Sequence, residues 1–140
     1  MSETLDTKGS CLCGAVEVHA SSMSTEVGAC HCGMCRKWSG GPFLGVDCGA
    51  SIDIKGQQYI TSYSSSDWAK RSFCSKCGTH LFYQLEKSGQ YIMPVGLFGE
   101  AAALKFDHQI FIDEKPDYYT FADETKNLTG EEVFAQFLGE

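Results

Sequence analysis

The chain has 140 residues, of which 43% are hydrophobic and 8 are cysteines, and its formal net charge is −7. This length predicts a single domain spanning residues 1–140, and the negative charge argues against general nucleic-acid binding. No apolar run approaches the roughly 20 residues of a membrane span, and residues 1–9 lack the apolar segment of a signal peptide. We therefore expect no membrane association and a cytoplasmic location.

Short strands separated by glycine and polar turns are predicted along most of the chain. Residues 1–9 are expected to form a loose arm, residues 14–20 alternate like a half-buried strand, and residues 21–24 are expected to turn. Residues 34–38 predict a helical turn, and residues 100–104 are compatible with another. Further strands are predicted at residues 25–29, 43–48, 51–54, 58–63, 68–73, 79–85, 91–95 and 108–112.

The end of the chain predicts a short helix. Thr129 is the expected N-cap, and Glu131 and Glu132 place negative charge in the first turn. Apolar side chains then follow on one face: Val133, Phe134, Phe137 and Leu138. With many short strands and little helix, the predicted fold class is mainly β.

Seven of the eight cysteines fall into three closely spaced motifs, C-x-C, C-x-C-x2-C and C-x2-C. Such clusters in a chain without secretory features favour metal binding over a disulfide framework. A closed structural zinc site takes four protein ligands, whereas a catalytic zinc keeps one position open. The count of seven therefore predicts one four-cysteine site and one three-cysteine site.

The C-x-C-x2-C motif predicts the three-cysteine site. Cys30 and Cys32 flank His31, so in an extended backbone their side chains point the same way. Gly33 allows the chain to turn and bring Cys35 back toward them, which gathers three sulfurs suited to a soft divalent metal. A small thiol is a suitable further ligand, because coordination to zinc deprotonates it.

The C-x2-C motif predicts the other site. Cys74 and Cys77, followed by Gly78, form a zinc-ribbon turn that needs a second pair of ligands. Cys11 and Cys13 are the remaining pair, so these four cysteines are the expected closed structural site.

Two alternatives remain open at the three-cysteine site. A fourth protein ligand would close it, the candidates being Cys48, His31, His80 and His108. Cys48 is predicted to be a small buried hydrophobe, and His31 to point away from the metal.

Basic residues near the motifs either offset thiolate charge or bind an anionic substrate: Arg36, Lys37, Lys70, Arg71 and Lys76.

Four segments of the chain are distinctive in combination: GSCLCG at 9–14, CHCGMCRK at 30–37, RSFCSKCGT at 71–79 and HQIF at 108–111, the last followed by Lys115 and Pro116. Together they resemble the glutathione-dependent formaldehyde-activating enzyme family, which includes S-(hydroxymethyl)glutathione synthase-like and centromere protein V-like proteins. Tyr118 and Tyr119 stand where the family leads us to expect a tryptophan. The resemblance covers roughly residues 8–120.

The resemblance implies a β-tent-like stack of small antiparallel sheets with two zinc ions. By motif, the structural zinc ligands are Cys11, Cys13, Cys74 and Cys77, and the catalytic ones are Cys30, Cys32 and Cys35. The implied activity is carbon–sulfur lyase chemistry that joins formaldehyde and glutathione into S-hydroxymethylglutathione.

The residues suggest how a substrate would bind. Arg36 and Lys37 are candidates to pair with its carboxylates, and Trp38 is a candidate apolar wall. The alternative is a non-catalytic zinc-binding module that binds glutathione or a protein partner. A homo-oligomer is compatible with the sequence.

Overall fold

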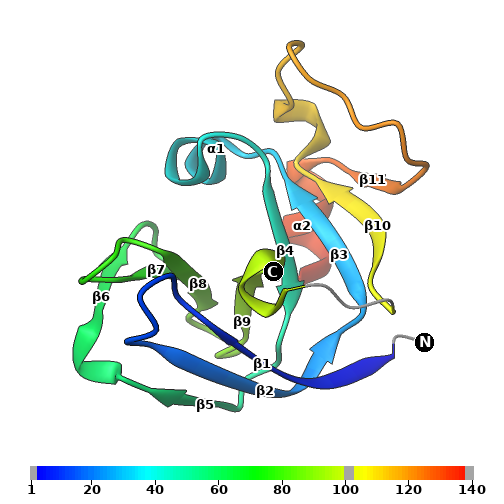
Figure 1. The fold of residues 1–140 in the computed structure, drawn as a ribbon. Helices are drawn as coiled ribbons and strands as arrows, with labels where there is room; N and C mark the ends of the chain where they lie inside the picture. Colours follow the sequence, from blue (N-terminus) through cyan, green and yellow to red (C-terminus); the bar gives the residue numbers. More distant parts are fainter. Residues whose placement is uncertain (1–2, 100–102, 138–140) are drawn as a thin grey trace. The chain divides into compact units, whose positions relative to one another are not determined.

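The structure, a computed structural model, describes residues 3–99 and 103–137 (Figure 1). Its residues group into two compact units. The first unit comprises Met1–Thr25 and Val46–Ala103, and the second comprises Glu26–Gly45 and Leu104–Glu140. Each of the two cysteine groups lies within one unit, so each unit is described by itself.

A three-stranded antiparallel sheet forms one part of the first unit. Its order is β1 (Thr4–Ser10), β2 (Glu17–Ser24) and β5 (Ile52–Lys55). The prediction of a loose arm at residues 1–9 is therefore wrong for β1. The predicted turn at residues 21–24 is also wrong, because Thr4 pairs with Ser24 and the ladder continues to that end of β2. Backbone pairing with β2 outweighs the polar composition of β1.

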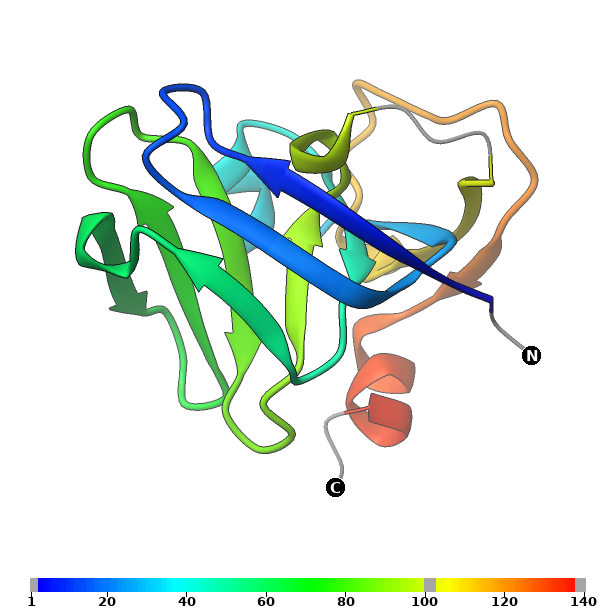
Figure 2. The same cartoon turned by 60° about the horizontal axis from the view of Figure 1, so that its bottom comes forward.

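Four further antiparallel strands complete the first unit (Figure 2). Along their hydrogen-bonded order they are β9 (Tyr91–Pro94), β8 (His80–Leu85), β7 (Ala69–Cys74) and β6 (Ile60–Ser64). All four overlap predicted strands, although the 3-10 turn η1 (Gln57–Tyr59) replaces the start of the one predicted at 58–63. A second 3-10 turn, η2 (Val95–Phe98), follows β9.

The second unit is built around β3 (Glu26–Cys30). This strand runs antiparallel to residues 43–45 of β4 (Phe43–Asp47), the part of β4 that belongs to this unit. It runs parallel to β10 (Lys105–Ile110), which in turn runs parallel to β11 (Lys126–Leu128). Strand β10 begins three residues before the predicted strand, whose last residue lies in the 3-10 turn η3 (Ile112–Glu114). Strand β11 was not predicted, because three residues carry little periodicity.

Two helices complete the second unit. Helix α1 (Gly33–Ser39) matches the predicted helical turn and ends at Gly40, whose φ of 82° is left-handed. Helix α2 (Gly130–Phe137) is the predicted C-terminal helix. The Thr129 hydroxyl accepts from the Glu132 amide, and the Glu132 carboxylate accepts from the Thr129 amide, so the N-cap is confirmed as a capping box.

The mainly β class is thus confirmed, with a short C-terminal helix. The apolar face of α2 buries Val133 and places Phe134 against Phe111, with ring centroids 5.8 Å apart. Leu138 and most of the candidate helical turn at residues 100–104 lie outside the described residues. Neither helix among the described residues has the length and hydropathy needed to cross a membrane.

Candidate functional site

Four thiols gather in the first unit. Cys11 and Cys13 lie in the loop between β1 and β2, and Cys74 and Cys77 bracket the turn between β7 and β8. Their sulfurs all lie within 4.8 Å of one another, with Cys13 Sγ 3.7 Å from Cys11 Sγ and 3.9 Å from Cys74 Sγ. We call these residues the four-thiol group.

Backbone geometry brings the two loops together. Gly78, with φ of 80°, turns the chain so that its amide donates to the Cys74 carbonyl at 2.7 Å. The Leu12 amide donates to the Thr79 hydroxyl at 3.1 Å, which joins the loop after β1 to the β7–β8 turn. The pKa of Cys77 is lowered to about 5, first by the Thr79 hydroxyl and then by backbone N–H groups. A thiolate at neutral pH is the form of cysteine that binds metals.

Three thiols gather in the second unit. Cys30 ends β3, Cys32 is the N-cap of α1, and Cys35 lies in the first turn of that helix, where its amide donates to Cys32 Sγ at 3.3 Å. The three sulfurs lie within 4.8 Å of one another, and all three residues are buried. We call these residues the three-thiol group.

The three-thiol group is electrostatically suited to a cation. The pKa of Cys30 is raised far above its ordinary value, first by its hydrogen bonds with Cys32 and Cys35, then by burial and by repulsion between thiolates. Three adjacent buried thiolates need positive charge nearby to coexist. Sulfur donors alone make the set a fit for a thiophilic ion such as zinc.

The candidate fourth ligands lie elsewhere. Among the described residues, no histidine, cysteine or carboxylate joins the three-thiol group. In the same unit, His108 Nδ1 lies 3.0 Å from the Asp107 carboxylate. Cys48 and His80 belong to the first unit. The Cys48 thiol is buried and donates to the Val46 carbonyl at 3.7 Å, and burial followed by the Asp47 charge raises its pKa to about 12.

His31 lies between two of the thiols but gives both ring nitrogens to other partners. Nδ1 lies 2.7 Å from the Tyr119 hydroxyl and Nε2 lies 2.8 Å from Oε1 of Gln109. The side chain is fully buried. Sequence reasoning singled out His31 and Tyr119 without pairing them, and it gave Gln109 no role although the HQIF segment contains it.

The candidate substrate-binding residues lie on helix α1. Arg36 is half-buried, and its Nε donates to the His31 carbonyl at 2.9 Å. Lys37 is exposed, and Trp38 stacks on Phe43 with ring centroids 5.7 Å apart. Arg36 and Trp38 therefore also contribute to the packing of their own unit.

The other basic residues near the motifs belong to the first unit. Arg71 is buried, donates from Nε to the Ser65 hydroxyl at 3.2 Å, and lies over the Tyr83 ring. Lys76 lies over the Tyr59 ring. These contacts favour a structural role for Arg71 and Lys76 over substrate binding.

Comparison with known proteins agrees with the resemblance. The sequence profile of the glutathione-dependent formaldehyde-activating enzyme family matches residues 6–114. A Schizosaccharomyces pombe protein named as an uncharacterized lyase is 35% identical over 132 residues, which cover 94% of this chain and 96% of the relative. A crystal structure of a Rhodobacter sphaeroides protein matches with a TM-score of 0.58 and 24% identity, covering 67% of this chain and 89% of that one.

The structural match supports the fold alone, at that level of identity. The profile and the yeast relative together confirm the predicted class of enzyme, a lyase. The match extends from β1 through η3 and includes all seven clustered cysteines. The chain belongs to the glutathione-dependent formaldehyde-activating enzyme family.

Proposed function

We propose that the protein is a zinc-dependent carbon–sulfur lyase that acts on glutathione or a similar thiol and a small aldehyde such as formaldehyde. In one direction the thiolate sulfur attacks the aldehyde carbon, a C–S bond forms as the C=O π bond opens, and the oxygen takes a proton from water to give a hydroxymethyl thioether. In the reverse direction the hydroxyl group loses its proton, the C=O bond forms again, and the C–S bond breaks with its electron pair returning to sulfur. The three buried sulfurs of the three-thiol group carry this proposal, supported by the family membership.

The proposal assigns one zinc ion to each thiol group. In the four-thiol group, Cys11, Cys13, Cys74 and Cys77 offer four sulfurs, the number that a closed structural site requires. In the three-thiol group, Cys30, Cys32 and Cys35 would hold a catalytic zinc. Zinc bound there supplies positive charge that favours the thiolate form of a substrate thiol.

Helix α1 supplies the proposed substrate-binding residues. The terminal N–H groups of Arg36 and the ammonium group of Lys37 are suited to carboxylates of a glutathione-like thiol. The indole of Trp38, fixed by its stacking on Phe43, would form an apolar wall.

We further propose that residues 1–140 act as one domain in the cytoplasm, where cysteines remain reduced.

Zinc content and turnover test the proposal together. The wild-type chain should hold two zinc ions and accelerate the reaction of glutathione with formaldehyde above its uncatalysed rate. Cys35→Ser should lose one zinc ion and the acceleration. The control is Cys48→Ala, which changes the buried cysteine outside both thiol groups and should keep two zinc ions and the full acceleration. Full activity of Cys35→Ser would overturn the proposed site. Two zinc ions without acceleration would favour the non-catalytic module that binds a thiol or a protein partner.

A further inference from the structure

Every polar group of His31 has a partner within the second unit. Its amide donates to the Ile110 carbonyl at 3.1 Å, and its carbonyl accepts from Arg36 Nε at 2.9 Å. Its ring nitrogens lie 2.7 Å from the Tyr119 hydroxyl and 2.8 Å from Gln109 Oε1. The residue between Cys30 and Cys32 is thus held by its backbone and by its side chain.

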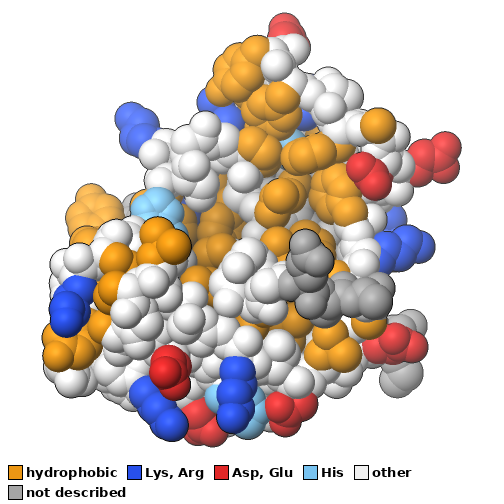
Figure 3. Space-filling view, in the orientation of Figure 1, with side chains coloured by type: hydrophobic (Ala, Val, Ile, Leu, Met, Phe, Trp, Pro, Cys, Tyr) orange, Lys and Arg blue, Asp and Glu red, His pale blue; other side chains and the backbone are white. Residues whose placement is uncertain are grey.

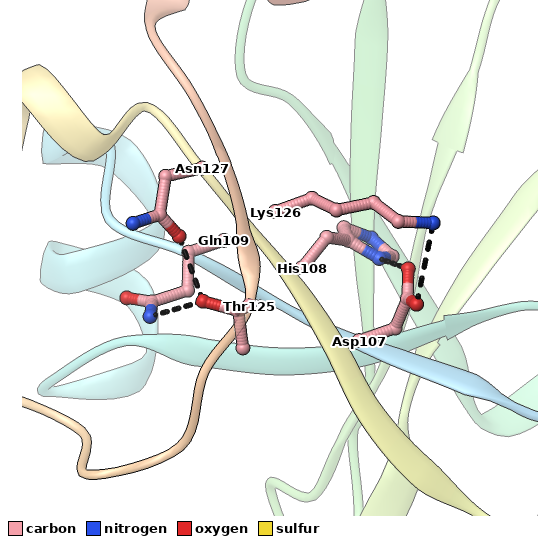
Figure 4. A network of polar contacts seen from close by, with 6 residues as sticks. All are labelled: Asp107, His108, Gln109, Thr125, Lys126 and Asn127. Atoms are coloured by element: carbon pink, nitrogen blue, oxygen red, sulfur yellow. Dashed lines mark hydrogen bonds and ion pairs between the residues drawn. The ribbon is translucent and has the colours of Figure 1, made fainter.

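The contact with Gln109 selects one tautomer of His31. Oε1 of Gln109 is a carbonyl oxygen and can only accept a hydrogen bond. Nε2 of His31 is therefore the donor and carries the proton. Gln109 Nε2 in turn donates to the Thr125 hydroxyl at 2.8 Å, and that hydroxyl donates to Asn127 Oδ1 at 2.7 Å (Figure 4). Gln109 and Asn127 are paired residues of β10 and β11, so the two strands hold this chain of hydrogen bonds in place.

Figure 4 also shows that His108 and Gln109 leave opposite faces of β10. This alternation is the ordinary geometry of a strand. It directs Gln109, which is buried, toward His31, whereas the His108 imidazole lies beside the Asp107 carboxylate. The network around His31 is therefore separate from the Asp107, His108 and Lys126 contacts on the other face.

The contact with Tyr119 fixes the other ring nitrogen. With Nε2 protonated, Nδ1 of His31 accepts from the Tyr119 hydroxyl, and the two rings stack with centroids 5.5 Å apart. Lys115 holds this part of the loop, because its ammonium group donates to the carbonyls of Tyr119 at 2.6 Å and Pro116 at 3.0 Å. Figure 3 shows hydrophobic side chains gathered around the segment between η3 and β11, the segment that contains Tyr119.

We propose that His31 is the positioning residue of the three-thiol group and that Gln109 and Tyr119 lock its orientation. The proposal rests on the proposed function, because it assumes that the three thiols hold a metal. Fixing the peptide and the ring of His31 fixes the backbone directions from which Cys30 and Cys32 project. Partners that orient a metal site in this way typically raise its metal affinity by about 10–100-fold.

Two pairs of variants test the lock in the full chain. Gln109→Leu removes the acceptor for Nε2, whereas Gln109→Glu keeps one. Tyr119→Phe removes the donor to Nδ1 but keeps the ring, and Tyr118→Phe is its matched control, since Tyr118 is 76% exposed. Competition of zinc with a chromophoric chelator gives the affinity of each of the two sites.

The lock predicts a specific pattern of metal affinity. Gln109→Leu and Tyr119→Phe should weaken one site by about 10–100-fold, and Gln109→Glu and Tyr118→Phe should leave it close to wild type. The four-thiol group should hold its zinc in every variant, which reports that the chain is folded. When cobalt replaces zinc, Gln109→Leu and Tyr119→Phe should differ from wild type in the thiolate-to-cobalt charge-transfer bands of the three-thiol group. The bands of the four-thiol group should stay the same.

The tautomer of His31 gives a readout that does not depend on metal affinity. Long-range proton–nitrogen NMR of the wild-type chain with its zinc bound should show a proton on Nε2 and none on Nδ1. A proton on Nδ1 would overturn the lock, because Nε2 would then not donate to Gln109 Oε1 and Nδ1 would not accept from Tyr119. Wild-type affinity in both Gln109→Leu and Tyr119→Phe would overturn the lock while leaving the proposed function intact. A wild-type chain that binds a single zinc would overturn both.

Discussion

The hydroxyl of Thr79 lies 3.1 Å from Sγ of Cys77 and accepts from the amide of Leu12. With its oxygen accepting that bond, Thr79 has its own proton available to donate to the sulfur. One side chain thus joins the two loops of the four-thiol group and stabilises the thiolate of one of its members, which lowers the pKa of Cys77 to about 5.

We therefore predict that Thr79→Val raises the pKa of Cys77 in the metal-free chain. Valine keeps the shape of threonine but cannot donate to the sulfur, whereas Thr79→Ser keeps the hydroxyl and should behave like wild type. The measurement is the pH dependence of Cys77 alkylation, followed by peptide mapping. A midpoint that stays near pH 5 in Thr79→Val would show that the backbone N–H groups alone lower the pKa.

The same shift makes the stability of the metal-free chain depend on pH. The pKa of Cys77 in the folded chain, about 5, lies below the ordinary value of 9.0. Its ionisation therefore stabilises the fold fully above pH 9, and this contribution is lost as the pH falls through 5. Thr79→Val should reduce the contribution, which urea unfolding at several pH values would detect as a flatter profile than that of Thr79→Ser.

Gly56 is predicted to be intolerant of substitution. Its φ is 85°, and a Cβ there would overlap the carbonyl oxygen of Ala15 in the loop that follows Cys13. Gly56→Ala should lower the free energy of unfolding by about 2–5 kcal/mol, since backbone strain and overlap add. Gly89 has a similar φ of 78° but its nearest neighbour would be 3.8 Å away, so Gly89→Ala should cost only about 1–2 kcal/mol. Equal costs in urea unfolding would mean that the Ala15 loop moves freely.

The three-thiol group could be predicted because it depends on local spacing. Cys30 and Cys32 leave one side of an extended segment, and helix α1 then returns Cys35 to them within three residues. The pairing of the loop at Cys11 with the turn at Cys74 followed from ligand count alone. The structure brings the seven cysteines into these two groups.

The partners of His31 could not be predicted from spacing. Gln109 and Tyr119 lie 78 and 88 residues away in sequence, and a polar residue on a strand carries no signal of which distant side chain it meets. Strand β1 was missed for a related reason, since its exposed polar residues reveal nothing of the backbone ladder with β2. Groups formed by residues close in sequence could be predicted, whereas contacts that depend on the order of the strands could not.

Cys48 should be dispensable for metal binding. The side chain is fully buried, and its pKa of about 12 keeps the thiol neutral at physiological pH. Cys48→Ala should keep both zinc ions and lower the free energy of unfolding by about 1–2 kcal/mol through the small cavity that it creates. Loss of one zinc in this variant would instead identify Cys48 as a ligand.

Replacing Arg36 and replacing Lys37 should have different effects on KM and on zinc affinity, although both residues are proposed to bind the substrate. Lys37 is exposed, so Lys37→Met should raise the KM for glutathione only about two- to fivefold, as expected for an exposed ion pair, and leave zinc affinity unchanged. Arg36 also donates to the His31 carbonyl. Arg36→Met should therefore raise KM by about tenfold or more and weaken zinc binding at the three-thiol group.

The variant Arg36→Lys separates these two effects. It keeps the positive charge for a substrate carboxylate but loses the Nε–H that reaches His31. Its KM should lie close to that of wild type once zinc is saturating, while its zinc affinity should fall as in Arg36→Met. If Arg36→Met and Lys37→Met changed KM equally and neither changed zinc affinity, the contact between Arg36 and His31 would contribute nothing to metal retention, and both basic residues would act on the substrate alone.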